Sequence, residues 1–392
     1  MRKFLALTIS LIILITCFGC TSTPATPDSI TLDGSYILVS PEDLGATVLQ
    51  AAQCIQSMLE NKMTLPSLKI AGEDPGSKAI VFALDGAMEP GAYKAELRGS
   101  SLYLTAQNPN VLLLATQNLR QMMLENNTVV VTRQMCDNLT GKYDMTKLPF
   151  RFISQNILFK NIAGGNTVED RKPRFKALMQ EYCPDIVGIQ EYSEDWKTYI
   201  NNTFGDIYTE ISSANKCILL RKDRYTLLDS GFFYLSPTPD VRSQFEGDSG
   251  PRACIWAIAT DDITNTTFLI LNCHPDWNND TQRALQVDVI FNHMGEKIQQ
   301  YPTLLCGDFN TLPDGPVYAR IIQDVKDASV NAENNLSDVD YTYHGFGKSS
   351  TLIDYIFYTD PFKPVNYRII SEMYKGHVSD HYAVMTDFTW SE

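Results

Sequence analysis

The C-terminal part of the chain contains a series of short apolar runs, and each run carries or ends in a polar side chain. Apolar runs of roughly four to eight residues bounded by turn residues are typical of buried strands. The runs lie within Phe150–Asn156, Asp185–Glu191, Phe268–His274, Thr303–Asn310, Leu352–Phe357 and Ser379–Met385. Strand ends are where layered α/β proteins build their sites. The pattern therefore predicts an α/β fold with one functional site at a sheet edge.

The polar residues at these positions form a chemically coherent set. They are Asn156, Glu191, Asn272, His274, Asp308, Asn310, Asp354, Asp380 and His381. Carboxylate and amide oxygens suit Mg²⁺ or Mn²⁺ better than zinc. Histidines with aspartate partners suit proton transfer and the stabilisation of developing charge. No Ser, Cys or Lys nucleophile has a recognisable activating partner, so we expect water to be the nucleophile, activated by a base and polarised by a metal.

In chain order these residues give the motifs N…QE…NxH…GDFN…IDYI…SDH. The ordered set resembles the endonuclease/exonuclease/phosphatase superfamily over residues 148–392. That resemblance implies a four-layer α/β/β/α sandwich and a Mg²⁺-dependent hydrolase, a phosphodiesterase or a phosphatase. It implies that Glu191 is the principal metal ligand, with Asn156 beside it and Asp380 nearby. It leaves open whether one or two metals act.

The same resemblance implies roles for the remaining residues. Asp308 and Asn310 match the pair that orients the attacking water and contacts the phosphate. His381 matches the general base or transition-state contact, and Asp354 matches the carboxylate that orients it. His274 matches the histidine that holds a phosphate oxygen or protonates the leaving group. Two further residues are expected to contact the substrate phosphate, namely Arg252 and Asn272.

The first twenty residues predict a secretion signal. Arg2 and Lys3 precede an apolar stretch, Phe4–Phe18, that is too short for a membrane-spanning helix of ~20 residues. The stretch ends at Cys20 before a segment rich in Ser, Thr and Pro, which resembles a bacterial lipoprotein signal. We expect Cys20 to be lipidated and residues 21–29 to form a tether, with a plain cleaved signal as the alternative. Either reading places the mature protein outside the cytoplasm, with a lipid anchor in the first case.

Residues 30–147 alternate strand-like and helix-like segments and predict a separate small α+β domain. The order of segments from Gly91 to Met122 resembles the accessory domain that precedes the barrel in family 20 β-hexosaminidases. That domain carries no catalytic residues, so a spacer role is expected. The alternative reading of the whole chain is a glycan-binding surface lipoprotein whose hydrolase domain is secondary or inactive.

Charge and cysteine content narrow the class of partner. The formal net charge is −14, and a strongly acidic body does not attract a polyanion at long range. Nucleic acid is therefore disfavoured but stays among the expected substrates, beside a phospholipid head group and a sugar phosphate. The cysteines after Cys20 lack metal-site spacing and several lie in apolar runs, so we expect buried free thiols. The protein is expected to be a monomer.

Overall fold

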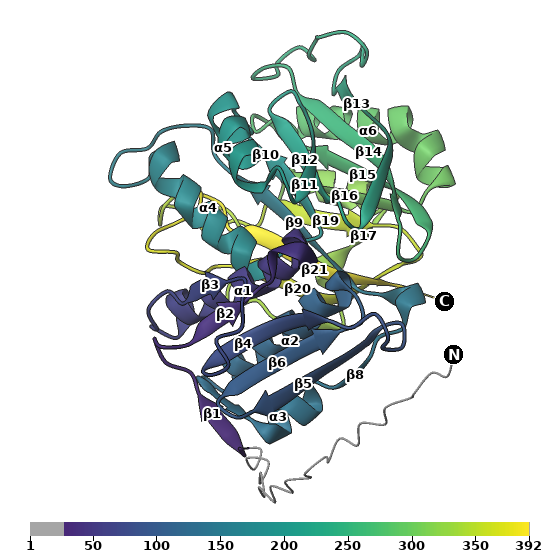
Figure 1. The fold of residues 1–392 in the computed structure, drawn as a ribbon. Coiled ribbons are helices and arrows are strands. Elements are labelled where there is room, and N and C mark those ends of the chain that lie inside the picture. Colours follow the sequence, from purple (N-terminus) through teal and green to yellow (C-terminus); the bar gives the residue numbers. More distant parts are fainter. Residues whose placement is uncertain (1–26, 392) are drawn as a thin grey trace, which may run out of the picture.

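The computed structural model describes residues 27–391. Cys20 and the predicted signal lie outside the described residues. The chain forms an N-terminal domain, residues 29–142, and a larger C-terminal domain, residues 150–390 (Figure 1). Within residues 27–391, no helix combines the length and the apolar character needed to cross a bilayer. The cysteines of this part are all free and buried, which confirms that prediction.

The N-terminal domain is a sheet covered by helices. Its six-stranded sheet has the order β3-β2-β4-β6-β5-β8, with strands Lys69–Ala71, Ile37–Val39, Ala79–Leu84, Ser101–Ala106, Ala92–Arg98 and Gly141–Lys142. A separate pair joins β1 (Ser29–Thr31) and β7 (Val130–Thr132). The helices are η1 (Glu42–Leu44), α1 (Ala46–Lys62), α2 (Pro109–Glu125) and α3 (Arg133–Asn138), and the short helix η2 (Met145–Lys147) lies in the link to the C-terminal domain. The expected hairpin is present, since β5 and β6 pair in antiparallel register.

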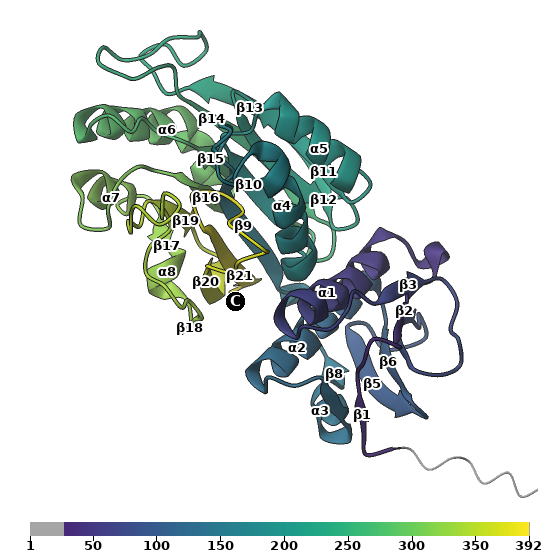
Figure 2. The ribbon, with the colours of Figure 1, turned by 90° about the vertical axis from the view of Figure 1, so that its left-hand side faces the viewer.

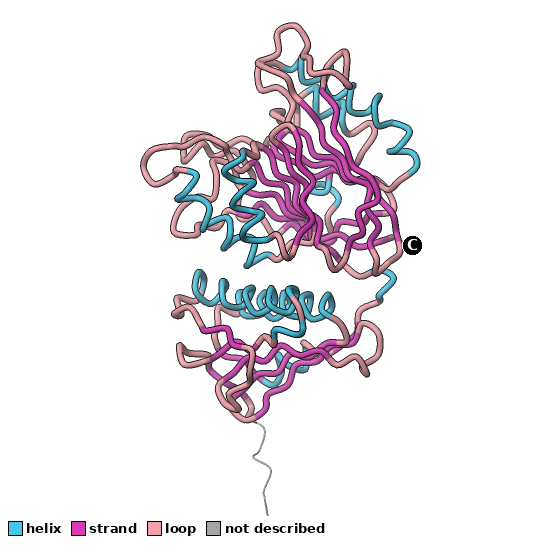
Figure 3. Tube along the Cα trace, turned by 45° about the horizontal axis from the view of Figure 1, so that its top comes forward, coloured by secondary structure: helices cyan, strands magenta, loops and turns pink. Residues whose placement is uncertain are grey.

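Helices α1 and α2 separate the N-terminal sheet from the C-terminal domain (Figures 2 and 3). Helix α2 begins where Asn108 accepts a hydrogen bond from the amide of Val111 and where proline occupies the first helical position. Helix α1 packs on helix α4 of the C-terminal domain. Helix α2 is joined to α4 by the buried ion pair of Arg120 with Glu181. The two domains therefore share a packed, polar-bonded interface.

The C-terminal domain contains two large mixed sheets. The first has the order β11-β12-β10-β9-β21-β20-β18, with strands Tyr208–Ser213, Lys216–Arg221, Ile186–Gln190, Phe150–Asn156, Ala383–Trp390, Phe362–Ile370 and Asn334–Asn335. The second has the order β13-β14-β15-β16-β19-β17, with strands Tyr225–Tyr234, Ala253–Asp261, Thr266–Cys273, Thr303–Asp308, Asp354–Tyr358 and Lys326–Asp327. The helices are α4 (Val168–Tyr182), α5 (Glu194–Phe204), α6 (Asp280–Gln300), α7 (Pro316–Ile321) and α8 (Ala328–Asn331).

Three apolar cores hold these layers together. The central core lies between the sheets and includes Phe150, Ile255 and Phe268. A second core packs α4 and α5 on the first sheet, and a third packs α6 and α7 on the second sheet. The face-to-face sheets with helices outside are visible in Figure 3. The expected α/β fold class, a four-layer sandwich behind a small α+β domain, is confirmed.

Candidate active site

Strand register brings the predicted residues to one edge of both sheets. In the first sheet, β9 and β10 run parallel and Asn156 pairs with Gln190, so Glu191 follows directly beside Asn156. In the second sheet, β15 and β16 run parallel and Cys273 pairs with Gly307, so His274 and Asp308 follow side by side. The antiparallel pair β16 and β19 then sets Asp354 opposite Asp308.

Two glycines allow the close packing behind this edge. A Cβ at Gly188 would overlap the sulfur of Cys306 in the facing sheet. A Cβ at Gly307 would overlap the carbonyl oxygen of Cys273 in the neighbouring strand. Any other residue at either position would push the strands or sheets apart. The two glycines thus fix the distance at which residues of the two sheets meet.

The carboxylate of Asp308 is the point at which the site residues converge. Its Oδ2 accepts a hydrogen bond from Nδ2 of Asn156 at 3.1 Å. The Nε2 atoms of His274 and His381 lie 3.4 Å and 3.7 Å from the same oxygen. Its Oδ1 accepts the amide hydrogen of Asn310 at 3.0 Å. One carboxylate therefore links residues from the ends of strands in both sheets.

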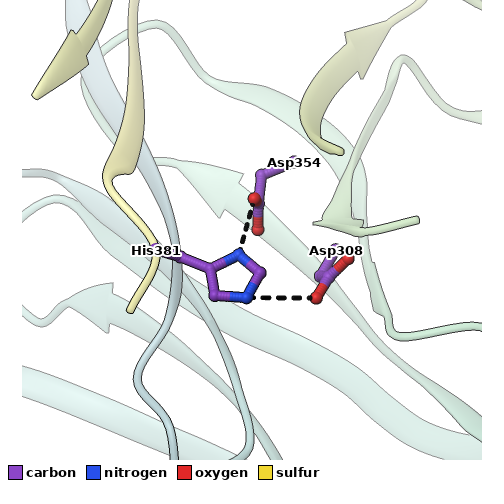
Figure 4. A group of neighbouring side chains, drawn as sticks. All are labelled: Asp308, Asp354 and His381. Atoms are coloured by element: carbon purple, nitrogen blue, oxygen red, sulfur yellow. Dashed lines mark hydrogen bonds and ion pairs between the residues drawn. The ribbon is translucent and has the colours of Figure 1, made fainter. Parts of the chain in front are cut away.

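His381 is held by a second carboxylate on its other nitrogen. Its Nδ1 lies 2.8 Å from Oδ2 of Asp354, and both side chains are buried (Figure 4). Burial alone would lower the pKa of His381, but the charges of Asp354 and Asp308 outweigh it and raise that pKa to about 10. The imidazole is therefore a cation at neutral pH, aimed by Asp354 and facing Asp308.

The two other titratable groups at this point are shifted in ways that complement His381. Burial, followed by the charge of Asp354, raises the pKa of Asp308 to about 7. Burial, followed by the positive charges of Arg252 and Lys216, lowers the pKa of His274 well below its ordinary value. The site thus combines a cationic imidazole, a neutral imidazole and a carboxylate able to take up a proton near neutrality.

Glu191 occupies a constrained position that directs its carboxylate into the site. Its φ of 58° lies in the left-handed region, which costs a non-glycine residue roughly 1 kcal/mol or more. Its Oε1 accepts from Nδ2 of Asn156 at 3.3 Å, and its Oε2 accepts from the amide of Phe159 at 3.2 Å. The side-chain Oδ1 of Asn156 accepts from the amide of Leu158 at 3.0 Å. Backbone strain is thus retained where the side chain faces the cleft.

The donors of this site fit a hard divalent cation. Glu191, Asp308 and Asp380 line the same cleft, so three carboxylates gather there with the amide of Asn156 beside them. Oxygen donors of this kind match Mg²⁺ or Mn²⁺. Among residues 27–391, the side chains of Asp308, Asp354 and His381 also bring one possible ligand atom each within 4.8 Å of one another. We interpret these three side chains as an oriented histidine and not as a metal site, because Oδ2 of Asp354 already contacts Nδ1 of His381.

A cleft of about 800 Å³ opens over these residues. Its lining includes Arg252, Asn310, the carboxylates of Glu191, Asp308 and Asp380, and the imidazoles of His274 and His381. Asn156 and Asp354 are buried and do not line it. Arg252 lies 3.4 Å from Asp276 and donates to Ser249 at 3.1 Å. Asn310 has a φ of 52° and donates to the carbonyl of Pro275 at 3.1 Å. The structure therefore brings Arg252, Asn310 and Asp380 into the predicted site.

Asn272 is the exception, and its predicted contact with substrate phosphate was wrong. The side chain is 0% exposed and does not line the cleft. Its Nδ2 donates to the carbonyls of Ile189 and Cys217 at 2.9 Å and 2.8 Å, and its Oδ1 accepts from Gln190 at 2.8 Å. Asn272 faces the same way as His274 but lies two residues deeper, roughly 7 Å further along the strand. It bonds the two sheets together rather than meeting a ligand.

Several residues of the cleft were missed by sequence reasoning. Lys216 and Tyr343 line it, and the ring of Tyr343 lies 4.8 Å from that of His381. Arg171 shapes one wall from behind, donating to the carbonyls of Leu158 and Lys160 at 2.9 Å and 2.7 Å while fully buried. A lysine opening the apolar run Cys217–Leu220 was the available signal for Lys216, because charged residues are rarely buried without cause.

Comparison with known proteins agrees with this geometry. Residues 154–381 match the model of the Endonuclease/Exonuclease/phosphatase family. No curated protein matches the sequence. Among solved structures, an endonuclease/exonuclease/phosphatase from Bacteroides vulgatus is 26% identical, with a TM-score of 0.59 over 62% of this chain and 99% of that one.

Two further solved structures share the fold at lower identity. A mannosyl-6-phosphatase of Bacteroides thetaiotaomicron is 23% identical, with a TM-score of 0.55 over 61% of this chain and 99% of that one. D. rerio TDP2, complexed with a single-strand DNA product, is 19% identical, with a TM-score of 0.51 over 61% of this chain and 98% of that one. The match over most of the C-terminal domain and the site built at its sheet edge show that the chain belongs to the endonuclease/exonuclease/phosphatase family.

Proposed function

We propose that this protein is a divalent-metal-dependent hydrolase of phosphoesters. The observation that carries the proposal is the convergence of Asn156, His274 and His381 on one oxygen of Asp308, in the cleft that Glu191 also lines. A base, an oriented cation and a hard-ligand set in one place are the groups that water attack on phosphorus requires.

The charge of each side chain indicates its role in the reaction. Asp308, with its pKa raised to about 7, accepts a proton from the attacking water. His381, kept cationic by Asp354, lies where it stabilises negative charge that develops on the phosphoryl oxygens. The water oxygen forms the new bond to phosphorus, the bond to the leaving oxygen breaks, and that oxygen takes up a proton from solvent. His274 faces the same carboxylate and is the residue we expect to contact the phosphate or the leaving group.

The metal would be held by Glu191, with Asn156 and Asp380 beside it. When bound, a Mg²⁺ or Mn²⁺ ion supplies a positive charge that polarises the phosphoryl group and favours ionisation of water. Three carboxylates face the same cleft, and a bound cation would offset their mutual repulsion. This charge balance supports a metal at this position.

Activity and metal dependence are tested together with chromogenic esters. Wild-type protein is incubated with p-nitrophenyl phosphate and with bis-p-nitrophenyl phosphate, in Mg²⁺ or in EDTA. We expect turnover only with the metal, and we expect loss of at least about 100-fold in Glu191→Gln and in His381→Ala. Equal rates in Mg²⁺ and EDTA, or wild-type rates in both variants, contradict the proposal. Turnover of neither ester favours the alternative of a binding protein with an inactive hydrolase domain.

Location and anchoring are a separate part of the proposal. We infer lipidation at Cys20 and action outside the cytoplasm from the sequence of residues 1–29. Expression in a bacterial host followed by membrane fractionation tests both. The wild-type chain should sediment with membranes and take up labelled palmitate, whereas Cys20→Ser should do neither.

A further inference from the structure

Lys216 is a buried lysine in the wall of the proposed active site. It is the first residue of β12, and its backbone pairs with Gln190 next to Glu191. Its side chain is 5% exposed and lines the cleft. Its Nζ donates one hydrogen bond, to the carbonyl of Ala214 at 3.1 Å. That bond leaves further N–H donors of the ammonium group for a ligand in the cleft.

The charge of Lys216 has no carboxylate partner. Among residues 27–391, no Asp or Glu oxygen lies within 4.0 Å of its Nζ, whereas other buried cations such as Arg120 and Arg224 have one. Burial, followed by repulsion from Arg252, lowers the pKa of Lys216 to about 8. A buried and unpaired cation is costly, so its place in a cleft wall indicates that an anion completes its environment.

Two cations that line the cleft, Lys216 and Arg252, differ in how far a neighbouring carboxylate offsets their charge. Arg252 also lines the cleft, but Asp276 lies 3.4 Å from its Nε and offsets part of its charge. Lys216 and Arg252 both act on His274, whose pKa they lower after burial. The cleft thus combines carboxylates suited to a metal with two cations, Lys216 and Arg252, and Lys216 is the one without a carboxylate within 4.0 Å.

The number of charges separates two classes of substrate. Near neutrality a phosphomonoester carries close to two negative charges, as phosphorylated side chains do, and a phosphodiester carries one. We propose that Lys216, with Arg252, binds the second negative charge of a terminal phosphate and makes the protein selective for phosphomonoesters. Lys216 is then a specificity-determining residue. This inference rests on the proposed function of the same site.

The negative net charge of the protein also favours small phosphomonoesters as substrates. With a formal charge of −14, the chain gains little from long-range attraction of a nucleic acid. A small dianion that reaches a local group of cations depends less on the overall charge, because exposed charges further than about 8–10 Å are screened at physiological salt. Recognition in the cleft therefore favours a small monoester over a polymer.

The test compares binding of two phosphate probes by calorimetry in the presence of Mg²⁺. Inorganic phosphate represents the dianionic group and dimethyl phosphate represents the monoanionic diester. Lys216→Met keeps the length of the side chain and removes its charge, and burying methionine there should not unfold the protein. We expect this variant to bind inorganic phosphate roughly 10- to 100-fold more weakly, and dimethyl phosphate within about 3-fold of wild type.

Three further variants sharpen the result. Lys222→Met removes an exposed lysine directly after the same strand, where Nζ donates to the carbonyl of Gly205, and should bind both probes as wild type does. Lys216→Arg should retain most of the phosphate affinity. Lys216→Gln takes the place of Lys216→Met if the latter does not fold. Equal weakening for both probes, or unchanged phosphate binding, overturns the inference.

Kinetics with the two p-nitrophenyl esters separates this inference from the proposed function. Wild type should prefer the monoester, and Lys216→Met should lose that preference through kcat/KM for the monoester alone. Hydrolysis of both esters with a ratio that Lys216→Met does not change overturns the specificity role and leaves the hydrolase intact. Binding of phosphate that depends on Lys216, without hydrolysis of either ester, overturns the hydrolase and leaves the anion site intact.

Discussion

His381 Nδ1 lies 2.8 Å from Asp354 Oδ2, and this contact joins the loop before β21 to the first residue of β19. The pair fixes the ring so that Nε2 faces Asp308. Replacing Asp354 by Asn removes the charge that raises the pKa of His381 and leaves the shape nearly unchanged. We expect kcat for a chromogenic phosphoester to fall roughly 100-fold with KM within about 3-fold. A kcat equal to that of wild type contradicts the role of this pair.

Metal binding by Glu191 is testable without any turnover. If Mg²⁺ binds the folded protein alone, an excess of about 100 times Kd stabilises it by about 2.7 kcal/mol. Thermal unfolding of wild type should therefore shift upward with Mg²⁺, and Glu191→Gln should lose most of that shift. The matched control is Glu194→Gln, an exposed position in the first turn of α5, which should keep it. Equal shifts in the two variants would remove Glu191 from the metal site.

The residues of the cleft could be predicted from the sequence best where they follow strands. Register carries such information over long distances, because side chains that end neighbouring strands must lie together whatever the loops do. That is why the strand pattern could place Glu191 beside Asn156 and His274 beside Asp308. The packing of the two sheets then brings these two pairs together. The fold class followed from the same runs, since buried strands of the C-terminal domain are nearly continuous apolar segments.

The sequence could not predict how deeply a residue lies along its strand, or which side chains on loops approach the cleft. Asn272 and His274 share a face, and only the packing of the second sheet decides that the first is sealed between the sheets and the second reaches the cleft. Tyr343 reaches the site through a loop bridge to His381, which no periodic pattern encodes. Arg171 stands in an ordinary helix, and its burial depends on the loop that it bonds.

The ion pair between Arg120 and Glu181 couples the two domains. The side chains are 4% and 0% exposed, so each charge depends on the other. Arg120→Met leaves a buried carboxylate without its partner and should lower the free energy of unfolding by about 3–5 kcal/mol. The double variant Arg120→Met with Glu181→Leu should recover much of that loss, because an apolar pair needs no compensation.

Urea denaturation followed by circular dichroism measures both variants. Wild type should unfold in one transition, and Arg120→Met should separate the unfolding of the two domains or lower the single midpoint. The exposed pair of Arg98 with Glu96 is the matched control, and Arg98→Met should change stability by less than about 1 kcal/mol. An Arg120→Met variant as stable as this control would show that the interface does not depend on the pair.

His344 gives the protein a predictable sensitivity to acid. The side chain is buried, with its ring centroid 4.3 Å from those of His377 and Tyr382, and its Nδ1 accepts the amide hydrogen of Phe346 at 3.1 Å. Burial, followed by the proximity of His377, lowers the pKa of His344 from 6.5 to about 3. Protonation of Nδ1 would also break the bond to Phe346.

The sign of the effect follows from which state binds the proton. Between pH 6.5 and about pH 3, the unfolded chain protonates His344 and the folded chain does not. The free energy of unfolding should therefore fall as the pH drops below 6.5, at up to about 1.4 kcal/mol per pH unit from this residue. His344→Gln keeps an acceptor for the amide of Phe346 and does not titrate. Urea unfolding from neutral pH to about pH 5 should give this variant a shallower pH dependence than wild type. Parallel curves for the two proteins would show that His344 is already protonated in the folded state or titrates alike in both.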